Sequence, residues 1–234
     1  MPQRKVYIPP LGEVLLVRRR SSKSLRLSVS TTGVVRVSMP YWAPYTAGIH
    51  FAASRQDWLL KQLSLHRPSL IRNGARIGKL HKVVFATDKT AKTPIIKIGD
   101  RLIFVKSATG LSGQAVQSRL RTACEKALKN ETQLLLTPRL KALAAAHSYA
   151  YKELRIRKLV SRWGSCSSDR VITLSYYLVQ LPWELIDYVI IHELIHTKQP
   201  HHGPEFWREF QHIIPDAKQL QRAIHAHKPQ VMPH

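Results

Sequence analysis

Hydrophobic and polar residues alternate along the first part of the chain. Leu25, Leu27 and Val29 precede Thr31-Thr32-Gly33, and the same alternation resumes at Val35. A period of two predicts two strands, and the glycine predicts a tight turn that joins them into a hairpin. Further strand-like segments follow at 82–87, 95–98 and 102–105, with Gly99-Asp100 as a second hairpin signal.

Other stretches have the spacing of helices. Residues 46–65 predict one helix, with Trp58 and Leu59 in its buried stripe. A longer pattern spans 112–147, where Thr137-Pro138 predicts an interruption because proline lacks a backbone N–H. The remaining pattern predicts strands at 154–160 and 171–174, a helix opened by Pro182, a helix from Pro204 to about Ile213, and a basic, histidine-rich tail.

The pattern changes near residue 110, and no internal repeat is visible. Before this point strands dominate with one helix between them, and after it helices dominate. We therefore predict two parts, a basic β-rich part over 1–110 and a helical part over 111–234.

The charge of the chain is unusually positive. Its 234 residues include 37 Lys and Arg against 14 Asp and Glu, a net charge of +23. Residues 1–120 carry 21 basic and 4 acidic groups, so this half alone contributes +17. Such a charge favours anionic partners, and nucleic acid or nucleotides are the candidates for the N-terminal half. The alternative is a basic surface that serves solubility alone.

Composition also bears on the compartment. Two cysteines, Cys124 and Cys166, are too few for a disulfide scaffold and fit a reducing cytoplasm. The first residues lack the apolar core of a signal peptide, and no apolar run approaches the roughly 18 residues of a membrane span. We expect a cytoplasmic protein with no membrane partner, and its oligomeric state stays open.

The segment His192-Glu193-Leu194-Ile195-His196 has the spacing of a zinc hydrolase site. Residues four apart lie on one face of a helix, so both imidazoles can bind one metal ion. Glu193 can then act as general base toward a water bound to that ion. A third protein ligand with one open position would make the site catalytic rather than structural.

The context of this segment supports a metal site. The helix is apolar on several faces and is expected to be buried, which makes a glutamate and two imidazoles costly unless they are paired or bind metal. Pro200 cannot continue the helix, and Gly203 permits a sharp turn. The chain can therefore fold back and bring His201 or His202 to the ion as the third ligand.

Several segments, in order, resemble the YgjP-like metallopeptidase family, which is related to the SprT-like and WLM zincin domains. These segments are Ser161-Arg162-Trp163-Gly164-Ser165-Cys166-Ser167, Ile172-Thr173-Leu174-Ser175, Asp187-Tyr188-Val189 running into the 192–196 motif, His202, and Phe206-Trp207. The likeness is specific over 155–210 and looser beyond, which implies one continuous domain over about 15–220 as an alternative to two parts. It also implies that His202 is the third ligand and that Zn²⁺ is the cofactor.

Together, the patterns and the resemblance predict an α+β fold. A basic, antiparallel β-rich N-terminal part is followed by a helical, zincin-like catalytic part with a small sheet and an active-site helix carrying the 192–196 motif. Spacing alone also admits the metzincins. These need a glycine where this chain has Gln199 and a methionine turn downstream, whereas the only later methionine is Met232.

The Trp-Gly-Ser-Cys loop supplies candidate substrate contacts. Gly164 permits close backbone approach, and Arg162 and Ser165 could meet an anionic substrate or a developing oxyanion. Tyr177 is a further candidate for the lining of the cleft. Trp163 and Cys166 are interpreted as packing residues, not as a nucleophile or ligand.

The predicted function is a zinc metallopeptidase in which Glu193 activates a zinc-bound water to cleave a peptide or protein. Two other hydrolases remain open: a nucleoside triphosphate pyrophosphate hydrolase, and a SprT-like protease acting on protein bound to nucleic acid. A non-enzyme alternative is a nucleic-acid-binding protein with a structural metal site. Such a site would not need Glu193.

Overall fold

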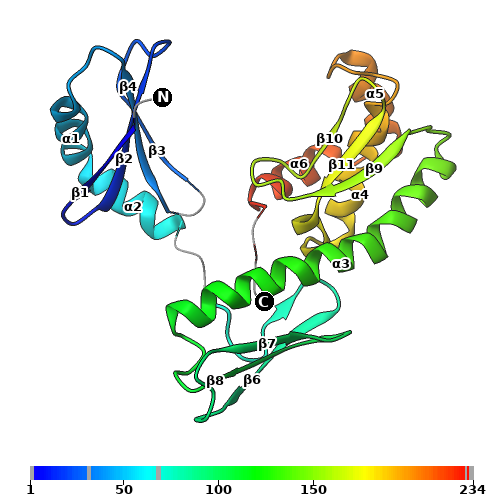
Figure 1. Cartoon of the computed structure of the whole chain (residues 1–234). Coiled ribbons are helices and arrows are strands. Elements are labelled where there is room, and N and C mark those ends of the chain that lie inside the picture. The colour runs from blue at the N-terminus through cyan, green and yellow to red at the C-terminus, as the bar shows by residue number, and fades with distance from the viewer. Residues whose placement is uncertain (1–2, 31–32, 67–69, 230, 232–234) are drawn as a thin grey trace. The chain divides into compact units, whose positions relative to one another are not determined.

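The computed structural model describes residues 3–30, 33–66, 70–229 and 231. It confirms a mixed α+β fold in which N-terminal strands precede a helical part (Figure 1). Thr31 and Thr32 of the predicted turn, and Met232 of the tail, lie outside the described residues. No helix within the described ranges is both long and apolar enough to span a membrane.

The chain divides into two compact units, residues 1–69 and 70–234. The division predicted near residue 110 therefore falls inside the second unit. The reason is packing: strand residues such as Val83 and Ile103 share one hydrophobic core with Leu120 and Leu128 of the following long helix.

The first unit is a four-stranded sheet with two helices. Its elements are β1 (Gln3–Ile8), β2 (Gly12–Arg19), β3 (Arg26–Val29), β4 (Val35–Pro40), α1 (Tyr45–Ser54) and α2 (Gln56–His66). The strand order is β1-β2-β4-β3, and β3 and β4 form the predicted antiparallel hairpin. Val14, Leu16, Val35 and Val37 lie in a core shared with Ala52 of α1 and Leu59 of α2, so the helices cover one face of the sheet.

The single helix predicted over 46–65 is wrong in one respect, because it is broken at Arg55 into α1 and α2. The break changes which side chains face the core. Leu59 is fully buried as predicted, whereas Trp58 is 47% exposed.

The second unit contains two sheets and the remaining helices. Its elements are β5 (Arg76–Ile77), β6 (His81–Thr87), β7 (Ile95–Ile98), β8 (Leu102–Ser107), α3 (Gln114–Ala146), β9 (Glu153–Arg157), β10 (Gly164–Cys166), β11 (Val171–Ser175), the 3₁₀ helix η1 (Tyr176–Gln180), α4 (Trp183–Ile195), α5 (Pro204–Ile213) and α6 (Ala217–His225). Helix α6 occupies part of the segment predicted to be a tail.

The sheet of β5 to β8 has the same topology as the sheet of the first unit. Its order is β5-β6-β8-β7, with two antiparallel hairpins joined through a parallel central pair, β6 and β8, just as β2 and β4 are parallel in the first sheet. The sheets are thus mixed rather than purely antiparallel. Alternating hydrophobicity reveals the strands and the hairpins but not this long-range pairing.

Helix α3 is the central element of the second unit. It contacts the β5–β8 sheet and also contacts η1, β9 and α4 (Figure 1). The predicted interruption at Pro138 is wrong, because the helix continues through it. Leu136 and Leu140, on either side of the proline, are completely buried, and this packing holds the helix together where one backbone hydrogen bond is lost.

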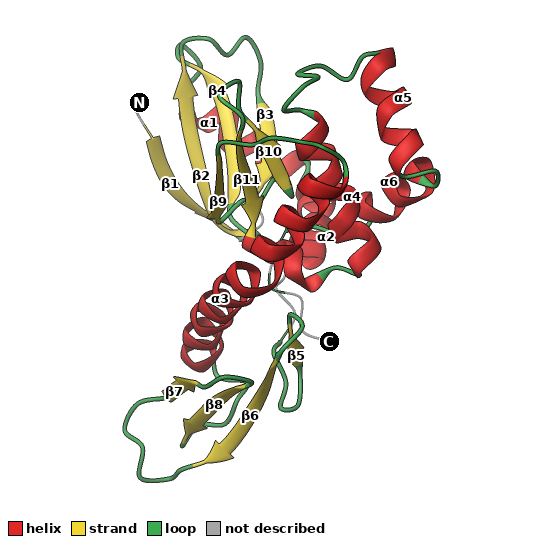
Figure 2. Cartoon of the chain, turned by 90° about the vertical axis from the view of Figure 1, so that its right-hand side faces the viewer, coloured by secondary structure: helices red, strands yellow, loops and turns green. Residues whose placement is uncertain are grey.

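The third sheet contacts α3 through β9, and it contacts α4 through β10. The sheet has the order β10-β11-β9, with β9 parallel and β10 antiparallel to β11. Helices α5 and α6 pack against α4, as Figure 2 shows. Helix α4 is buried along nearly its whole length, as the sequence predicted.

A buried glutamate of α3 holds the turn between β5 and β6. The Glu131 carboxylate accepts hydrogen bonds from the backbone N–H groups of Lys79, Leu80 and His81, at 2.6, 3.1 and 3.1 Å, and contacts His81 Nδ1. Lys79 Nζ in turn donates to the carbonyl of Leu181, just before α4. This network ties the sheet to the start of the helix that carries the 192–196 motif.

Gly78 is required beneath this carboxylate. Its φ is +72°, and a Cβ there would lie 2.4 Å from Glu131 Oε2, whereas a Cβ on Gly74, with φ +82°, would meet only Lys82 Cε at 3.8 Å. Gly74→Ala should therefore cost only the backbone strain, about 1–2 kcal/mol of unfolding free energy. Gly78→Ala should cost at least about 1–3 kcal/mol more, because it also disrupts the hydrogen bonds of a buried carboxylate. Urea unfolding of the two variants measures the difference, and equal losses would contradict this role of Glu131.

Candidate functional site

Two histidines of α4 lie on one face of the helix and meet above its last turn. His192 is in the final turn, and His196 is the C-cap residue, where the helix ends. The helix itself is anchored by Ile190, Ile191 and Leu194, which are at most 1% exposed. Four-residue spacing on a rigid, buried helix thus fixes the separation of the two imidazoles.

The chain after α4 turns back on itself. The N–H groups of Lys198 and Gln199 bond to the carbonyl of Ile195, and the Gln199 carbonyl lies 2.9 Å from His196 Nδ1. Helix α5 then begins at Pro204 with Gly203 as its N-cap. The His196–Gln199 contact places a proton on Nδ1 and leaves Nε2 of His196 with its lone pair toward the other histidines.

Three imidazole nitrogens converge at this turn. The Nε2 atoms of His192 and His196 are 3.2 Å apart, those of His196 and His202 are 3.1 Å apart, and those of His202 and His192 are 3.0 Å apart. Three nitrogen ligands about 2.0–2.1 Å from a tetrahedral zinc ion are separated by roughly 3.3 Å, close to these distances. The three histidines therefore fit a single divalent metal ion, and they form a group that could hold one. His201 is exposed and is not part of this group.

A phenylalanine of α5 packs behind all three imidazoles. The Phe206 ring centroid lies 5.0 Å from that of His192 and 4.8 Å from those of His196 and His202. Phe206 and Phe210 are both completely buried. The apolar face of α5 therefore sets the orientation of the third histidine relative to the two on α4. The sequence already suggested Phe206 as a core anchor for the turn that carries the third histidine, and its burial against all three imidazoles agrees with this.

Burial keeps the inner histidine neutral. Burial, with smaller effects from His196 and His202, lowers the pKa of His192 to about 3. Its Nδ1 atom is buried and has no hydrogen-bond partner among the described residues. A neutral imidazole is the form that binds metal, so the environment selects the state that a ligand needs.

Glu193 is buried beside the histidines, at 5% exposure. Burial raises the pKa of its carboxyl to about 8, and the positive charge of Arg162 opposes this shift. Its carboxylate makes no hydrogen bond with the described residues and is not a member of the convergent group of histidines. It is therefore free to exchange a proton.

Strand β10 lies directly against Glu193. A Cβ on Gly164 would lie 2.7 Å from Glu193 Oε1 and 2.8 Å from its Cγ. The sequence predicted close backbone approach at Gly164. The structure shows that the group next to the Gly164 backbone is the Glu193 carboxylate.

The histidines and Glu193 open into a cleft of about 840 Å³. Arg162, Ser165 and Lys198 line this cleft together with the histidines, so two of the sequence candidates do lie near the motif. The Lys198 Nζ also lies 4.4 Å from the centroid of the Tyr149 ring. Lys198 carries no sequence signal beyond its position just after the motif and was not predicted.

The structure places Tyr177 away from the cleft, and it places Cys166, which was interpreted as a packing residue, in the lining of the cleft. Tyr177 is a correction: it is 3% exposed, does not line the cleft, and donates a hydrogen bond of 2.6 Å to Glu125 of α3. Cys166 lines the cleft, but burial raises the pKa of its thiol to about 11 with Glu193 adding to the shift. The thiol is therefore protonated at neutral pH and is a poor nucleophile or ligand.

Comparisons with known proteins identify the family of this chain. Residues 23–227 match the YgjP-like metallopeptidase domain family, so the chain belongs to this family. The crystal structure of the metallopeptidase zymogen of Pyrococcus abyssi abylysin is 30% identical, with a TM-score of 0.34, over 37% of this chain and 90% of that chain. None of the curated proteins matches the chain.

The adjacent histidines His201 and His202 offer a matched test of the ligand set. His202→Ala should lower the affinity for zinc at least tenfold, because it removes one of the three converging nitrogens, whereas His201→Ala should leave the affinity unchanged. Competition with a chromogenic chelator measures both. A loss of affinity in the His201 variant with none in the His202 variant would refute the assignment.

Proposed function

We propose that this metallopeptidase-family protein is a zinc-dependent peptidase in which His192, His196 and His202 hold the ion and Glu193 is the general base. The observation that carries the proposal is the set of three Nε2 atoms, 3.0–3.2 Å apart, beside a buried carboxylate in an open cleft. A closed structural site would need a fourth protein ligand, and the described group has three.

The protein groups have separate roles. His192, His196 and His202 would hold a zinc ion, which would provide Lewis acidity toward the scissile carbonyl and toward an attacking water. Glu193 takes the proton from the attacking water and delivers it to the leaving nitrogen. The backbone at Gly164 packs against the Glu193 side chain and limits its position on that side. Arg162, which lines the cleft, supplies positive charge near the developing oxyanion.

The first test is the removal of the base. Glu193→Gln keeps the size of the side chain but cannot accept a proton, so kcat should fall by about 10²–10⁴-fold while one zinc ion per chain remains bound. Hydrolysis of casein together with metal analysis of the same sample measures both. Full activity of this variant would refute the mechanism, as would full activity of the parent after its zinc has been removed with a chelator.

The second test displaces the Glu193 carboxylate without substituting Glu193 itself. Gly164→Ala forces the Glu193 carboxylate to shift, and a misplacement of about 1 Å can cost on the order of 10²-fold in rate. Zinc affinity should stay unchanged. The control is Gly99→Ala in the β7–β8 hairpin, where the nearest atom to the new Cβ is 3.6 Å away, and this variant should keep its activity. Wild-type kcat in Gly164→Ala would contradict the placement of Glu193.

A phosphate-bearing substrate is the second candidate. Arg162 and Lys198 both line the cleft, and among the described lining residues only Glu193 is acidic, so a nucleoside triphosphate would find positive charge beside the three histidines. Parallel assays with casein, with protein bound to DNA and with nucleoside triphosphates separate the peptidase from the pyrophosphate hydrolase and from a SprT-like protease, with Glu193→Gln as the blank.

A further inference from the structure

Arginines and aromatic rings gather at the end of the first sheet where β2 and β4 finish. We call this group the arginine–aromatic cluster, and it consists of Arg4, Arg18, Arg20, Tyr41, Trp42 and Tyr45. The Arg18 guanidinium lies 4.1 Å from the Tyr45 ring centroid, Arg4 lies 5.8 Å from the same ring, and Arg20 lies 5.8 Å from the Tyr41 ring. Guanidinium groups are thus already stacked on or beside two of the three rings.

Two of the rings face solvent. Trp42 is 80% exposed and Tyr41 is 49% exposed, and both lie in the short connection between Pro40 and Pro44. The prolines restrict the backbone of this connection, so the rings are presented on a stiff support. Tyr41 and Trp42 are adjacent exposed rings, and the Arg20 guanidinium lies beside the Tyr41 ring, so they form a contiguous aromatic surface next to a cation rather than scattered apolar residues.

The surroundings of the cluster are strongly basic. Residues 1–69 contain 11 Lys and Arg and 2 Asp and Glu, a net charge of +9. Glu13 lies near the opposite end of β2 and is paired with Lys5 at 2.9 Å. Among the described residues no carboxylate forms an ion pair with an arginine of the cluster.

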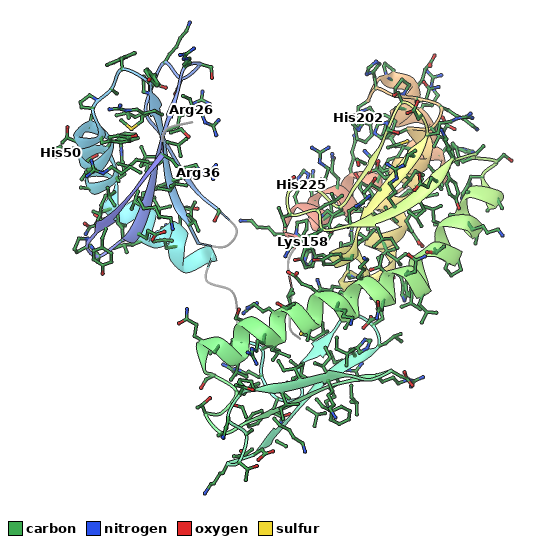
Figure 3. All side chains as sticks on the ribbon, viewed as in Figure 1. Arg26, Arg36, His50, Lys158, His202 and His225 are labelled. Carbon is green, nitrogen blue, oxygen red and sulfur yellow. The ribbon has the colours of Figure 1, made fainter. Side chains whose placement is uncertain are left out.

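The positive charge continues onto the helix-free face of the sheet. Arg36 alternates with the buried Val35 and Val37, and Arg26 is paired with Ser38 two residues further along β4. Both arginines extend from the side of the sheet opposite to α1, which carries His50 (Figure 3). Arg26 and Arg36 therefore add positive charge on the face of the sheet opposite to α1, and Arg26 lies near the end of β4 that leads to the cluster.

We propose that the arginine–aromatic cluster binds single-stranded nucleic acid. Trp42 and Tyr41 stack on unpaired bases, Arg4, Arg18 and Arg20 contact the adjoining phosphates, and Arg26 and Arg36 extend the path along the backbone. Stacking on exposed rings requires bases that are not already paired in a duplex. The cluster lies in the first unit, so this proposal does not rest on the metal site.

The composition of the cluster favours a nucleic acid over an anionic membrane. A membrane surface also attracts arginine and tryptophan, but stable insertion needs a face with several large apolar residues. Here the connection between the two prolines exposes Tyr41 and Trp42, whereas Ala43 is buried. Arg20 beside the exposed Tyr41 ring, with Arg4 and Arg18 at the Tyr45 ring of the same cluster, instead offers phosphate contacts next to rings on which bases can stack.

Fluorescence anisotropy of the full chain with labelled oligo(dT) and oligo(U) tests the proposal. Strands of about 20 nucleotides are long enough to cover a site of this size. Trp42→Ala should raise the Kd about 5- to 100-fold, the usual loss for one stacked base, and Trp42→Phe should restore part of the affinity. The matched control is Trp58→Ala on α2, which removes another exposed tryptophan and should leave the Kd unchanged.

The salt dependence separates the arginines from the rings. Arg20→Gln should reduce the slope of log K against log salt concentration by about 0.7, the value for one lost phosphate contact, while Trp42→Ala should leave the slope unchanged. Arg55→Gln, at the far end of α1, is the charge-matched control and should have no effect on the slope. Circular dichroism checks that each variant is folded.

Three results would overturn the proposal. The first is no binding of either single strand at low salt. The second is equal affinity of the Trp42→Ala variant and the parent chain. The third is stronger binding to a duplex of the same length, or to phosphatidylserine vesicles, than to the single strands.

Discussion

The structure of the second unit around α4 depends on how the polar groups at the end of this apolar helix are accommodated. Helix α4 packs into the core along nearly its whole length, and yet its last turn carries two imidazoles and a carboxylate. Such groups destabilise a core unless each is neutral, paired or bound to a ligand. Here burial keeps His192 neutral, and the fold-back after Pro200 adds His202, so that three nitrogens face one point. A metal ion is the partner that would satisfy all three at once.

The two buried glutamates of this unit show how surroundings decide a role. Glu131 and Glu193 both lie against a glycine, Gly78 and Gly164, where a methyl group would collide with the carboxylate. Glu131 is satisfied by three backbone N–H groups and His81, and it therefore holds a turn in place. Glu193 has no such donors among the described residues, and burial raises its pKa to about 8. The same chemical group is structural where its hydrogen bonds are complete and available for proton transfer where they are not.

The two proposed binding surfaces lie in different units of the chain. The proposed hydrolytic site lies wholly in the second unit, within the turn after α4 and the edge of β10. The excess positive charge of the first unit lies on a sheet with one covered and one open face, and its arginines meet exposed aromatic rings at one end. The β5–β8 sheet of the second unit repeats the topology of the first sheet, but the proposed hydrolytic site lies at a different sheet, that of β9 to β11.

The sequence by itself determined what depends on local spacing. It predicted the hairpins, the buried α4, the position of the two histidines four residues apart, and the family, which the match over 23–227 confirms. It did not determine what depends on contacts between distant segments. The parallel central strands, the continuity of α3 through Pro138, the burial of Tyr177 against Glu125, and the approach of Gly164 to Glu193 all arise from packing between residues far apart in the chain. Local periodicity indicates which face of an element is apolar, but only the tertiary structure decides which other element covers that face.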